Sequence, residues 1–289
     1  MLRRQLGDAS WARTRRLIET GKVFLDGRAV LDPAALVPAT AALHVRMAAP
    51  RPQAPAALGR DAIVFADVHV VVVKKPAGIS TVPFEPGEKG TLEELVRGLL
   101  VSRGDPRRAD APLGIVHRID RETSGLVVFA RTLDAKRALG LQFRAHSVHR
   151  RYLALAAGSV SDGTLRSRLV RDRGDGRRGS TRHPRLGQLS ITHVRVLERL
   201  PGATLVECRL ETSRTHQIRI QLAETGHPLL GEPVYVPRDF PPLPPAPRLM
   251  LHAAELGFVH PTTGRALHFE DPLPDDLRGV LQRLRDAAR

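Results

Sequence analysis

Short runs of β-branched and aliphatic residues recur along most of the chain and predict strands. The clearest runs are residues 69–73, 126–130, 151–155 and 204–210. Segments with helical periodicity follow some of them, at 91–100 and 133–144. Because direct strand-to-strand links outnumber strand–helix–strand units, we expect a mainly antiparallel mixed sheet with flanking helices, which is an α+β fold.

The first 46 residues carry a pattern of their own. Residues 10–21 predict a short helix that Ser10 caps and Gly21 stops, residues 22–27 a strand and tight turn, and residues 42–46 a closing strand. Proline and alanine dominate the stretch that follows, which is typical of a linker. We therefore predict a small N-terminal α/β domain at 1–46, a linker at 47–59 and a large domain at 60–289.

Charge narrows the class of partner. The 289 residues include 45 Lys and Arg against 30 Asp and Glu, a formal net charge of +15. Such a balance favours a polyanion, with nucleic acid ahead of an acidic membrane, although an arginine-rich proteome would raise the count as well. The absence of a signal peptide and of any membrane-length apolar run predicts a soluble cytoplasmic protein without membrane contact. The one cysteine, Cys208, allows no internal disulfide. Residues 164–189 carry many Arg and Gly residues and few apolar ones, which predicts a mobile basic loop.

The densest polar segment, residues 114–125, lies between two strand-like runs. Within it Asp120 stands between Arg118 and Arg121, and nearby cations favour the ionised carboxylate. An ionised Asp held on a loop between buried strands can act as a nucleophile or a base. Spacing alone favours the alternative, a surface Asp in an ordinary ion pair.

Two further segments offer groups that bind anions or bases. Residues 212–222 contain Arg214 and Arg219, which could bind phosphate or a carboxylate, or could lie on a solvated corner. Tyr152 follows two arginines and could stack on a base, although this triplet alone favours a half-buried strand tyrosine. The twelve histidines show no HExxH or similar ligand spacing, so neither a metal nor another cofactor is expected.

Taken together, these segments resemble the RluA-type family of pseudouridine synthases, which are RNA-modifying isomerases. The resemblance spans roughly residues 60–280 and rests on motifs in the family's order, at 73–78, 117–125, 214–219, 226–235 and 248–253. Two positions depart from the family pattern: Ser213 replaces the usual Gly, and Glu232 replaces the usual Asp. The Ser213 change would matter if this turn needs a positive φ. Residues 1–46 are similar to an S-four-like RNA-binding domain, shortened at its first helix.

The resemblance implies roles for individual residues. Asp120 would attack the ribose or the base, or remove a ribose proton, and Arg219 would be its ion-pair partner. Tyr152 would stack on a uracil flipped out of its helix and assist the final proton removal. The substrate and RNA-binding residues would be Arg118, which fills the vacated space or holds phosphate, with Arg121, Arg214, His216, Ile218 and His117.

The implied partner is a structured bacterial RNA, with large-subunit ribosomal RNA favoured over tRNA, bound by a monomer that needs no protein partner. A non-catalytic RNA-binding factor on the same scaffold is the main rival, and the intact set Asp120, Tyr152 and Arg219 argues against it. A phosphoester hydrolase with an Asp nucleophile ranks lower, because the sequence lacks an acidic metal-binding cluster.

Overall fold

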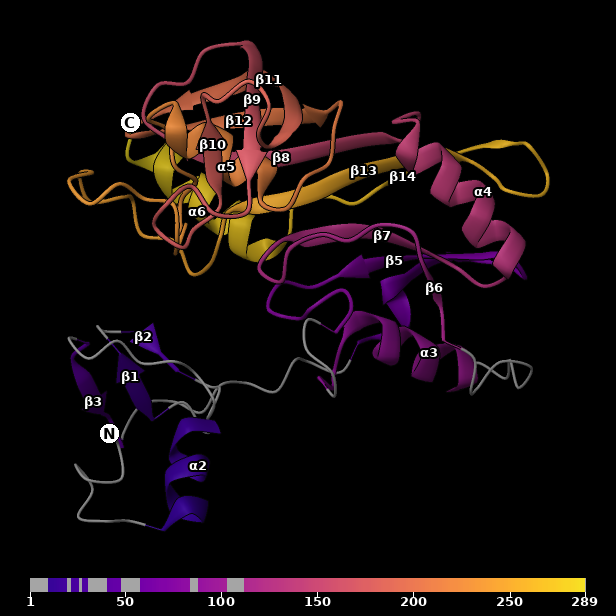
Figure 1. Cartoon of the computed structure of the whole chain (residues 1–289), viewed down its shortest axis with the longest axis horizontal. Coiled ribbons are helices and arrows are strands. Elements are labelled where there is room, and N and C mark those ends of the chain that lie inside the picture. Colours follow the sequence, from indigo (N-terminus) through magenta and orange to yellow (C-terminus); the bar gives the residue numbers. More distant parts are fainter. Residues whose placement is uncertain are drawn as a thin grey trace. The chain divides into compact units, whose positions relative to one another are not determined.

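The computed structural model describes residues 10–19, 22–25, 28–30, 41–47, 58–83, 88–102 and 112–288. The chain divides into two compact units, Met1–Ala56 and Ala57–Arg289 (Figure 1). This division falls inside residues 47–59, the stretch that the sequence predicts as a linker. Residues 48–57 of that stretch lie outside the described residues.

The described residues of the N-terminal unit form a helix and a small sheet. Helix α2 (Trp11–Glu19) precedes β1 (Val23–Leu25), β2 (Arg28–Ala29) and β3 (Leu43–Val45), and β1 pairs antiparallel with both other strands. Ser10 starts the helix as predicted, because its Oγ accepts a hydrogen bond from the Arg13 N–H at 3.2 Å. The predicted stop at Gly21 and the turn at 26–27 lie outside the described residues.

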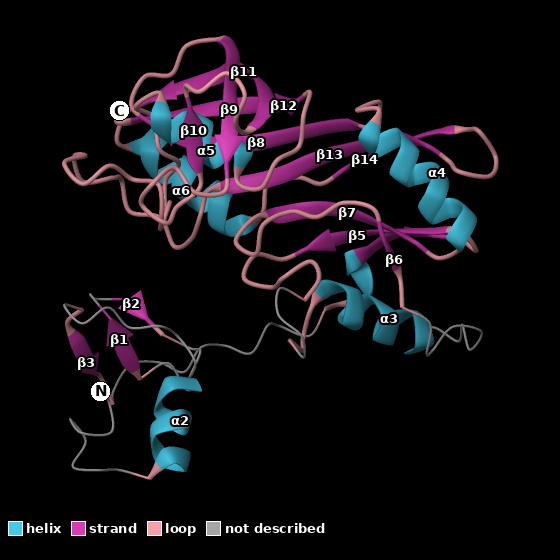
Figure 2. Ribbon diagram, viewed as in Figure 1, coloured by secondary structure: helices cyan, strands magenta, loops and turns pink. Residues whose placement is uncertain are grey.

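The second unit contains one sheet of eleven strands with helices outside it (Figure 2). The strands are β4 (Ile63–Ala66), β5 (Val70–Lys75), β6 (Gly114–Ile115), β7 (Ser124–Ala130), β8 (His149–Ala157), β9 (Gly163–Val170), β10 (Gly179–Thr181), β11 (Gln188–Leu200), β12 (Ala203–Leu210), β13 (Leu251–Val259) and β14 (Ala266–Glu270). The helices are η1 (Arg60–Ala62), α3 (Leu92–Ser102), α4 (Leu133–Arg144), α5 (Gln217–Glu224) and α6 (Asp275–Asp286). The α+β prediction is confirmed.

Strand β13 joins two halves of this sheet. The order is β10-β9-β11-β12-β8-β13-β7-β5-β4, with β14 beside β13 and β6 beside β7. Strand β13 is antiparallel to β8 but parallel to β7, whereas the β4–β5, β5–β7 and β8–β12 pairs are antiparallel. We call the β7–β13–β8 junction the seam, because it connects an early half (β4 to β7) with a later half (β8 to β12).

Apolar side chains on both faces of β5 bury the early half of the sheet. Val71 on β5 belongs to a cluster with Leu92 and Val96 of α3, whereas Val72 belongs to a cluster with Leu139 of α4. These side chains are essentially inaccessible to solvent. Each fully buried residue of this kind contributes about 1.5–3 kcal/mol relative to an exposed one. Packing on both faces therefore stabilises the half of the sheet that adjoins the seam.

Residues 164–189 differ from the sequence-based expectation. Their many Arg and Gly residues predicted a mobile basic loop, but the segment contains most of β9, all of β10 and the start of β11. On β9, Leu165 and Leu169 are more buried than Arg166, which is exposed, so the arginines occupy the solvent face of an antiparallel sheet.

None of the described helices is long and apolar enough to cross a bilayer.

Candidate active site

The seam brings three predicted site residues into one pocket. Asp120 lies on the loop between β6 and β7, Tyr152 on β8, and Arg219 on α5. All three line a small pocket of about 40 Å³. Asp120 comes from the early half of the sheet, and Tyr152 and Arg219 come from the later half. We call this pocket the Asp120 pocket.

Arg219 holds two carboxylates at once. Its Nη1 donates to Asp120 Oδ2 at 3.3 Å, while its Nε and Nη2 donate to the two oxygens of Glu232 at 2.8 Å each. Burial lowers the pKa of the Arg219 guanidinium, but the Glu232 hydrogen bonds and the Glu232 and Asp120 charges outweigh it and raise the pKa above its usual value. The bidentate pair fixes the guanidinium plane and aims its remaining donor at Asp120.

Glu232 is positioned by the backbone. Its side chain is fully buried, and its Oε1 also accepts hydrogen bonds from the Val234 N–H at 2.9 Å and the Tyr235 N–H at 3.3 Å. The Asp120 side chain, in contrast, keeps 17% of its surface exposed to the pocket. Glu232 therefore accepts hydrogen bonds from protein donors on both of its oxygens, whereas the Asp120 carboxylate remains partly accessible.

His216 stands on the other side of Asp120. Its Nε2 lies 3.8 Å from Asp120 Oδ1, and its Nδ1 lies 2.6 Å from the Tyr235 hydroxyl oxygen. Burial lowers the pKa of His216 and raises that of Tyr235, so both are neutral near pH 7. His216 also has a positive φ of 59°, a backbone strain of about 1–3 kcal/mol that is common at functional sites.

Tyr152 and Ile218 form the apolar wall of the pocket. Tyr152 is 8% exposed and Ile218 is 4% exposed, and both line the pocket that contains Asp120. Burial raises the pKa of the Tyr152 phenol, which is therefore protonated near neutral pH. The ring offers a flat apolar face at the position where a base would have to lie next to Asp120.

Helix α5 is attached to the sheet by two buried amide side chains. Gln217 Nε2 donates to the Ile191 carbonyl at 3.0 Å, and Gln221 Nε2 donates to the Ser190 carbonyl at 3.0 Å. Their Oε1 atoms accept from hydroxyls, Thr212 to Gln217 and Thr192 to Gln221. Because buried amides require partners, these bonds fix the rotation of α5 and with it the direction of Arg219.

Lys75 supports the loop that carries Asp120 through hydrogen bonds to backbone carbonyls. The Lys75 Nζ donates to the carbonyls of Pro76, Ile79 and Arg121 at 2.8–2.9 Å. Burial lowers the pKa of this ammonium group to about 7, although the Glu122 and Asp120 charges oppose the shift. The segment 73–78, a family motif without an assigned role in the sequence, thus supports the backbone of the Asp120 loop.

Two predicted site residues lie outside the pocket. The ring of His117 stacks on Phe143 with centroids 4.4 Å apart, its Nε2 accepts a hydrogen bond from the Val128 N–H, and burial lowers its pKa to about 3. Arg121 is exposed and donates to the Gly78 carbonyl at 2.9 Å. The structure groups the other predicted residues around the pocket: Arg118, Asp120, Tyr152, Arg214, His216, Ile218 and Arg219.

Sequence reasoning gave no site role to three residues that the structure places here. Thr123 lines the pocket, and its buried Oγ1 has no hydrogen-bond partner among the described residues. Glu232 and Tyr235 hold Arg219 and His216 respectively. Glu232 and Tyr235 belong to the motif at 226–235, so the motif was the available signal.

The two departures from the family pattern fit the structure. Ser213 is not among the residues with a positive φ, so this turn does not require glycine. Ser213 lines the Asp120 pocket. Glu232 is long enough to hold both the Nε and Nη2 of Arg219.

A second hollow lies beside the Asp120 pocket and shares Arg214 and Ser213 with it. It has a volume of about 390 Å³, and Arg171 and Arg178 contribute to its wall. Within the described part of the chain, neither of these two arginines has a carboxylate partner. We call this hollow the arginine basin.

The chain is similar to known proteins along most of its length. The model of a family described as RNA pseudouridylate synthase matches residues 69–224. The chain is 38% identical over 287 residues to the "Uncharacterized RNA pseudouridine synthase YlyB" of Bacillus subtilis, covering 95% of this chain and 90% of that protein. It is also 38% identical to the "Ribosomal large subunit pseudouridine synthase D" of Pseudomonas aeruginosa, covering 93% and 85% of the two chains.

A solved structure shows the same fold. "Human RNA Pseudouridylate Synthase Domain Containing 4" matches with a TM-score of 0.63 at 24% identity, covering 78% of this chain and 93% of that one. The family model covers more than half of the chain, and the relatives align along almost their full length. The chain belongs to the RNA pseudouridylate synthase family and is an RNA pseudouridine synthase, an isomerase that acts on RNA.

Proposed function

We propose that Asp120 is the catalytic carboxylate of this synthase and that its substrate is a uridine in large-subunit ribosomal RNA. The observation that supports Asp120 is its 3.3 Å contact with Arg219 in a pocket that Tyr152 also lines. The permanently charged Arg219 guanidinium supplies a counter-charge beside the oxygen that would attack or remove a proton. The one other acidic residue in the cluster, Glu232, is fully engaged by protein donors.

The reaction is an isomerisation, so its atoms balance without a co-reactant. The bond from ribose C1′ to uracil N1 breaks, a bond from C1′ to C5 forms, the C5 proton is lost, and N1 gains a proton. Asp120 starts this sequence by attack on the ribose or the base, or by removal of a ribose proton; each route uses the same carboxylate oxygen. Arg219 stabilises that oxygen before the reaction and again when the carboxylate is released.

The target uridine must leave its stack, at a cost of a few kcal/mol. The Asp120 pocket, at about 40 Å³, holds only about three water molecules at 10–15 Å³ each. A uracil therefore needs the outer wall to move, and the exposed Arg118 and the half-buried Arg214 belong to that wall. Arg118 would then fill the vacated space in the RNA or hold a phosphate, while the base lies between Tyr152 and Ile218.

Several features support a ribosomal RNA target. Relatives that align over most of this chain are named ribosomal large subunit pseudouridine synthase D. The arginine basin adjoins the pocket and suits the phosphates that flank a target nucleotide. The N-terminal unit would act as the S-four-like RNA-binding module. We place the enzyme in the bacterial cytoplasm as a monomer that needs no cofactor or protein partner.

Tritium release from RNA that carries tritium at uracil C5 tests the role of Asp120. The wild type should release tritium in proportion to pseudouridine formed. Asp120→Asn, which keeps the side-chain volume, should lose activity by about 10⁴-fold or more while it still binds RNA. Comparable release by the variant would overturn the proposal.

The RNA target is tested separately by mapping pseudouridines in a deletion strain. We expect one or more sites to disappear from large-subunit ribosomal RNA and to return when the wild-type gene, but not the Asp120→Asn gene, is restored. Loss of sites from tRNA alone would contradict the ribosomal assignment and leave the role of Asp120 intact.

A further inference from the structure

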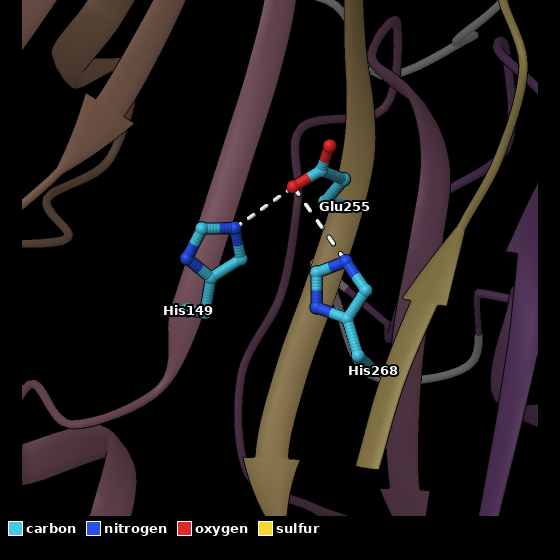
Figure 3. A group of neighbouring side chains, drawn as sticks. All are labelled: His149, Glu255 and His268. Carbon is cyan, nitrogen blue, oxygen red and sulfur yellow. Dashed lines mark hydrogen bonds and ion pairs between the residues drawn. The ribbon is translucent and has the colours of Figure 1, made fainter.

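A group of metal-binding side chains lies on three adjacent strands outside the Asp120 pocket. His149 is on β8, Glu255 on β13 and His268 on β14 (Figure 3). One ligand atom from each of the three residues lies within 4.8 Å of the others. His149 and Glu255 are 106 positions apart, and Glu255 and His268 are 13 positions apart. No local spacing therefore indicates the group, and the sequence alone predicted no metal.

The register of the sheet explains why the two imidazoles meet. Gly257 pairs with His149 on one side and with His268 on the other, and two residues earlier Glu255 pairs with Arg151 and Glu270. A Cβ on residue 257 would lie 3.1 Å from His268 Nδ1 and 3.2 Å from His149 Cβ. The glycine thus leaves the space in which the two rings face each other, with centroids 5.4 Å apart.

Both imidazoles direct Nε2 toward the same carboxylate oxygen. The His149 Nε2 is 2.9 Å from Glu255 Oε2, and the His268 Nε2 is 3.7 Å from the same atom, as the dashed lines in Figure 3 show. Ligands of a tetrahedral zinc ion stand roughly 3.4 Å apart, because each bond is about 2.0–2.2 Å long. Both histidine side chains are about half exposed, at 40% and 50%, so small rotations bring the three atoms to this spacing.

The second oxygen of Glu255 is already occupied. Arg151 Nε donates to Glu255 Oε1 at 2.5 Å, which leaves Oε2 for a further ligand. A carboxylate that binds a metal through one oxygen commonly receives a hydrogen bond on the other, which orients it.

We propose that His149, Glu255 and His268 bind one divalent transition-metal ion of the zinc type. Two imidazoles and one carboxylate suit Zn²⁺ and its neighbours in the first transition row better than Mg²⁺ or Ca²⁺, which prefer oxygen alone. Water or Glu270, whose Oε1 is 3.6 Å from the His268 Nε2, completes the coordination. The ion links β8, which carries Tyr152, to the β13–β14 hairpin.

Zinc binding is measured on the full-length chain without a polyhistidine tag, after removal of metals by a chelator. Isothermal titration calorimetry with ZnCl₂ should give one site per chain. Co²⁺ serves as a second probe, because its visible absorption reports a tetrahedral environment. Neither readout uses RNA or activity, so the result is independent of the proposed reaction.

The decisive variants are His149→Ala and His268→Ala, each expected to weaken Zn²⁺ binding at least about tenfold. His193→Ala is the matched control, because His193 is also a half-exposed strand histidine paired with a carboxylate, Glu211 at 3.2 Å. It should bind as the wild type does. Zn²⁺ should also raise the Tm of the wild type and of His193→Ala more than that of either decisive variant.

Absence of one-to-one binding by the wild type would overturn the proposal. So would equal binding by His149→Ala, His268→Ala and the wild type, since the ion would then be held elsewhere. A loss that His193→Ala shares would point to non-specific surface binding and would also reject the site.

Discussion

The Asp120 pocket and the arginine basin share Arg214 and Ser213 as wall residues. They differ in whether their other arginines are paired with carboxylates. In the pocket, Arg219 is 5% exposed and binds two carboxylates. In the basin, Arg171 and Arg178 face a larger hollow and have no carboxylate partner among the described residues. Buried paired charge fixes the geometry of a reaction, whereas exposed unpaired charge attracts phosphate, so the two regions should respond differently to substitution.

Arg219→Ala should have the largest effect on stability, because it leaves the buried Glu232 without its partner. We expect the free energy of unfolding to fall by about 3–5 kcal/mol in urea titrations. Tritium release should fall by at least about 10²-fold, since Asp120 loses its counter-ion. Glu232→Asp, which keeps the charge, is the control and should cost far less. A loss below about 1 kcal/mol in Arg219→Ala would show that the pocket does not depend on this pair.

Two substitutions of Tyr152 distinguish a role of its ring in stacking from a role of its hydroxyl in proton transfer. Tyr152→Leu should lower kcat/KM by the equivalent of about 1–3 kcal/mol, the usual value of a base–aromatic stack. Tyr152→Phe keeps the ring and loses the hydroxyl, so it should recover most of the stacking contribution to binding. Single-turnover rates with labelled RNA compare the two. Equal defects in both variants would assign the main contribution to the hydroxyl.

The basin is tested by its salt dependence. Arg171→Gln together with Arg178→Gln should weaken RNA binding and reduce the slope of log K against log salt by about 0.7–0.9 for each phosphate that the protein no longer neutralises. At saturating RNA the rate should remain near that of the wild type, because neither residue lines the Asp120 pocket. Arg265→Gln, an exposed arginine outside both regions, is the matched control. An unchanged slope would remove the basin from the RNA path.

Substitution of His117 should have the smallest effect, a change in how the free energy of unfolding depends on pH. Its pKa is about 3 in the folded chain, lowered by burial, against an ordinary value of 6.5. The unfolded chain therefore binds more protons below pH 6.5, and stability should fall as the pH drops from 6.5 toward 3. His117→Gln removes this titration while it keeps an acceptor for the Val128 N–H. Urea titrations at pH 7 and pH 6 should show a loss in the wild type about 0.7 kcal/mol greater than in the variant.

The sequence predicted the class of fold well because strand periodicity depends on local residues. Runs such as 126–130 become buried strands whatever else the chain does, and β7 follows that pattern. The basic segment at 164–189 was misread because its alternation of leucine and arginine is sparse, and pairing with β11 decides its conformation. Long-range pairing carries little signal in a single sequence.

Seven of the nine predicted site residues line one pocket, but the sequence did not indicate the directions of their side chains. Asp120 and Arg219 are 99 positions apart, so only the resemblance to a family indicated that they meet. His117 precedes Asp120 by three positions, yet its ring faces Phe143 instead of the pocket, because the direction of a loop side chain depends on its tertiary contacts. The His149–Glu255–His268 group depends entirely on strand register, which the sequence leaves open.

The seam also bears on how the protein is made. During synthesis, the segment with Asp120 emerges before the segments with Tyr152 and Arg219, and β13, which lies between the two halves, is translated after all three. Partly synthesised chains have no strand to join β7 to β8, so the two sets of side chains cannot meet at the ribosome. A message truncated before codon 251 should therefore yield a protein without pseudouridine synthase activity in the tritium-release assay.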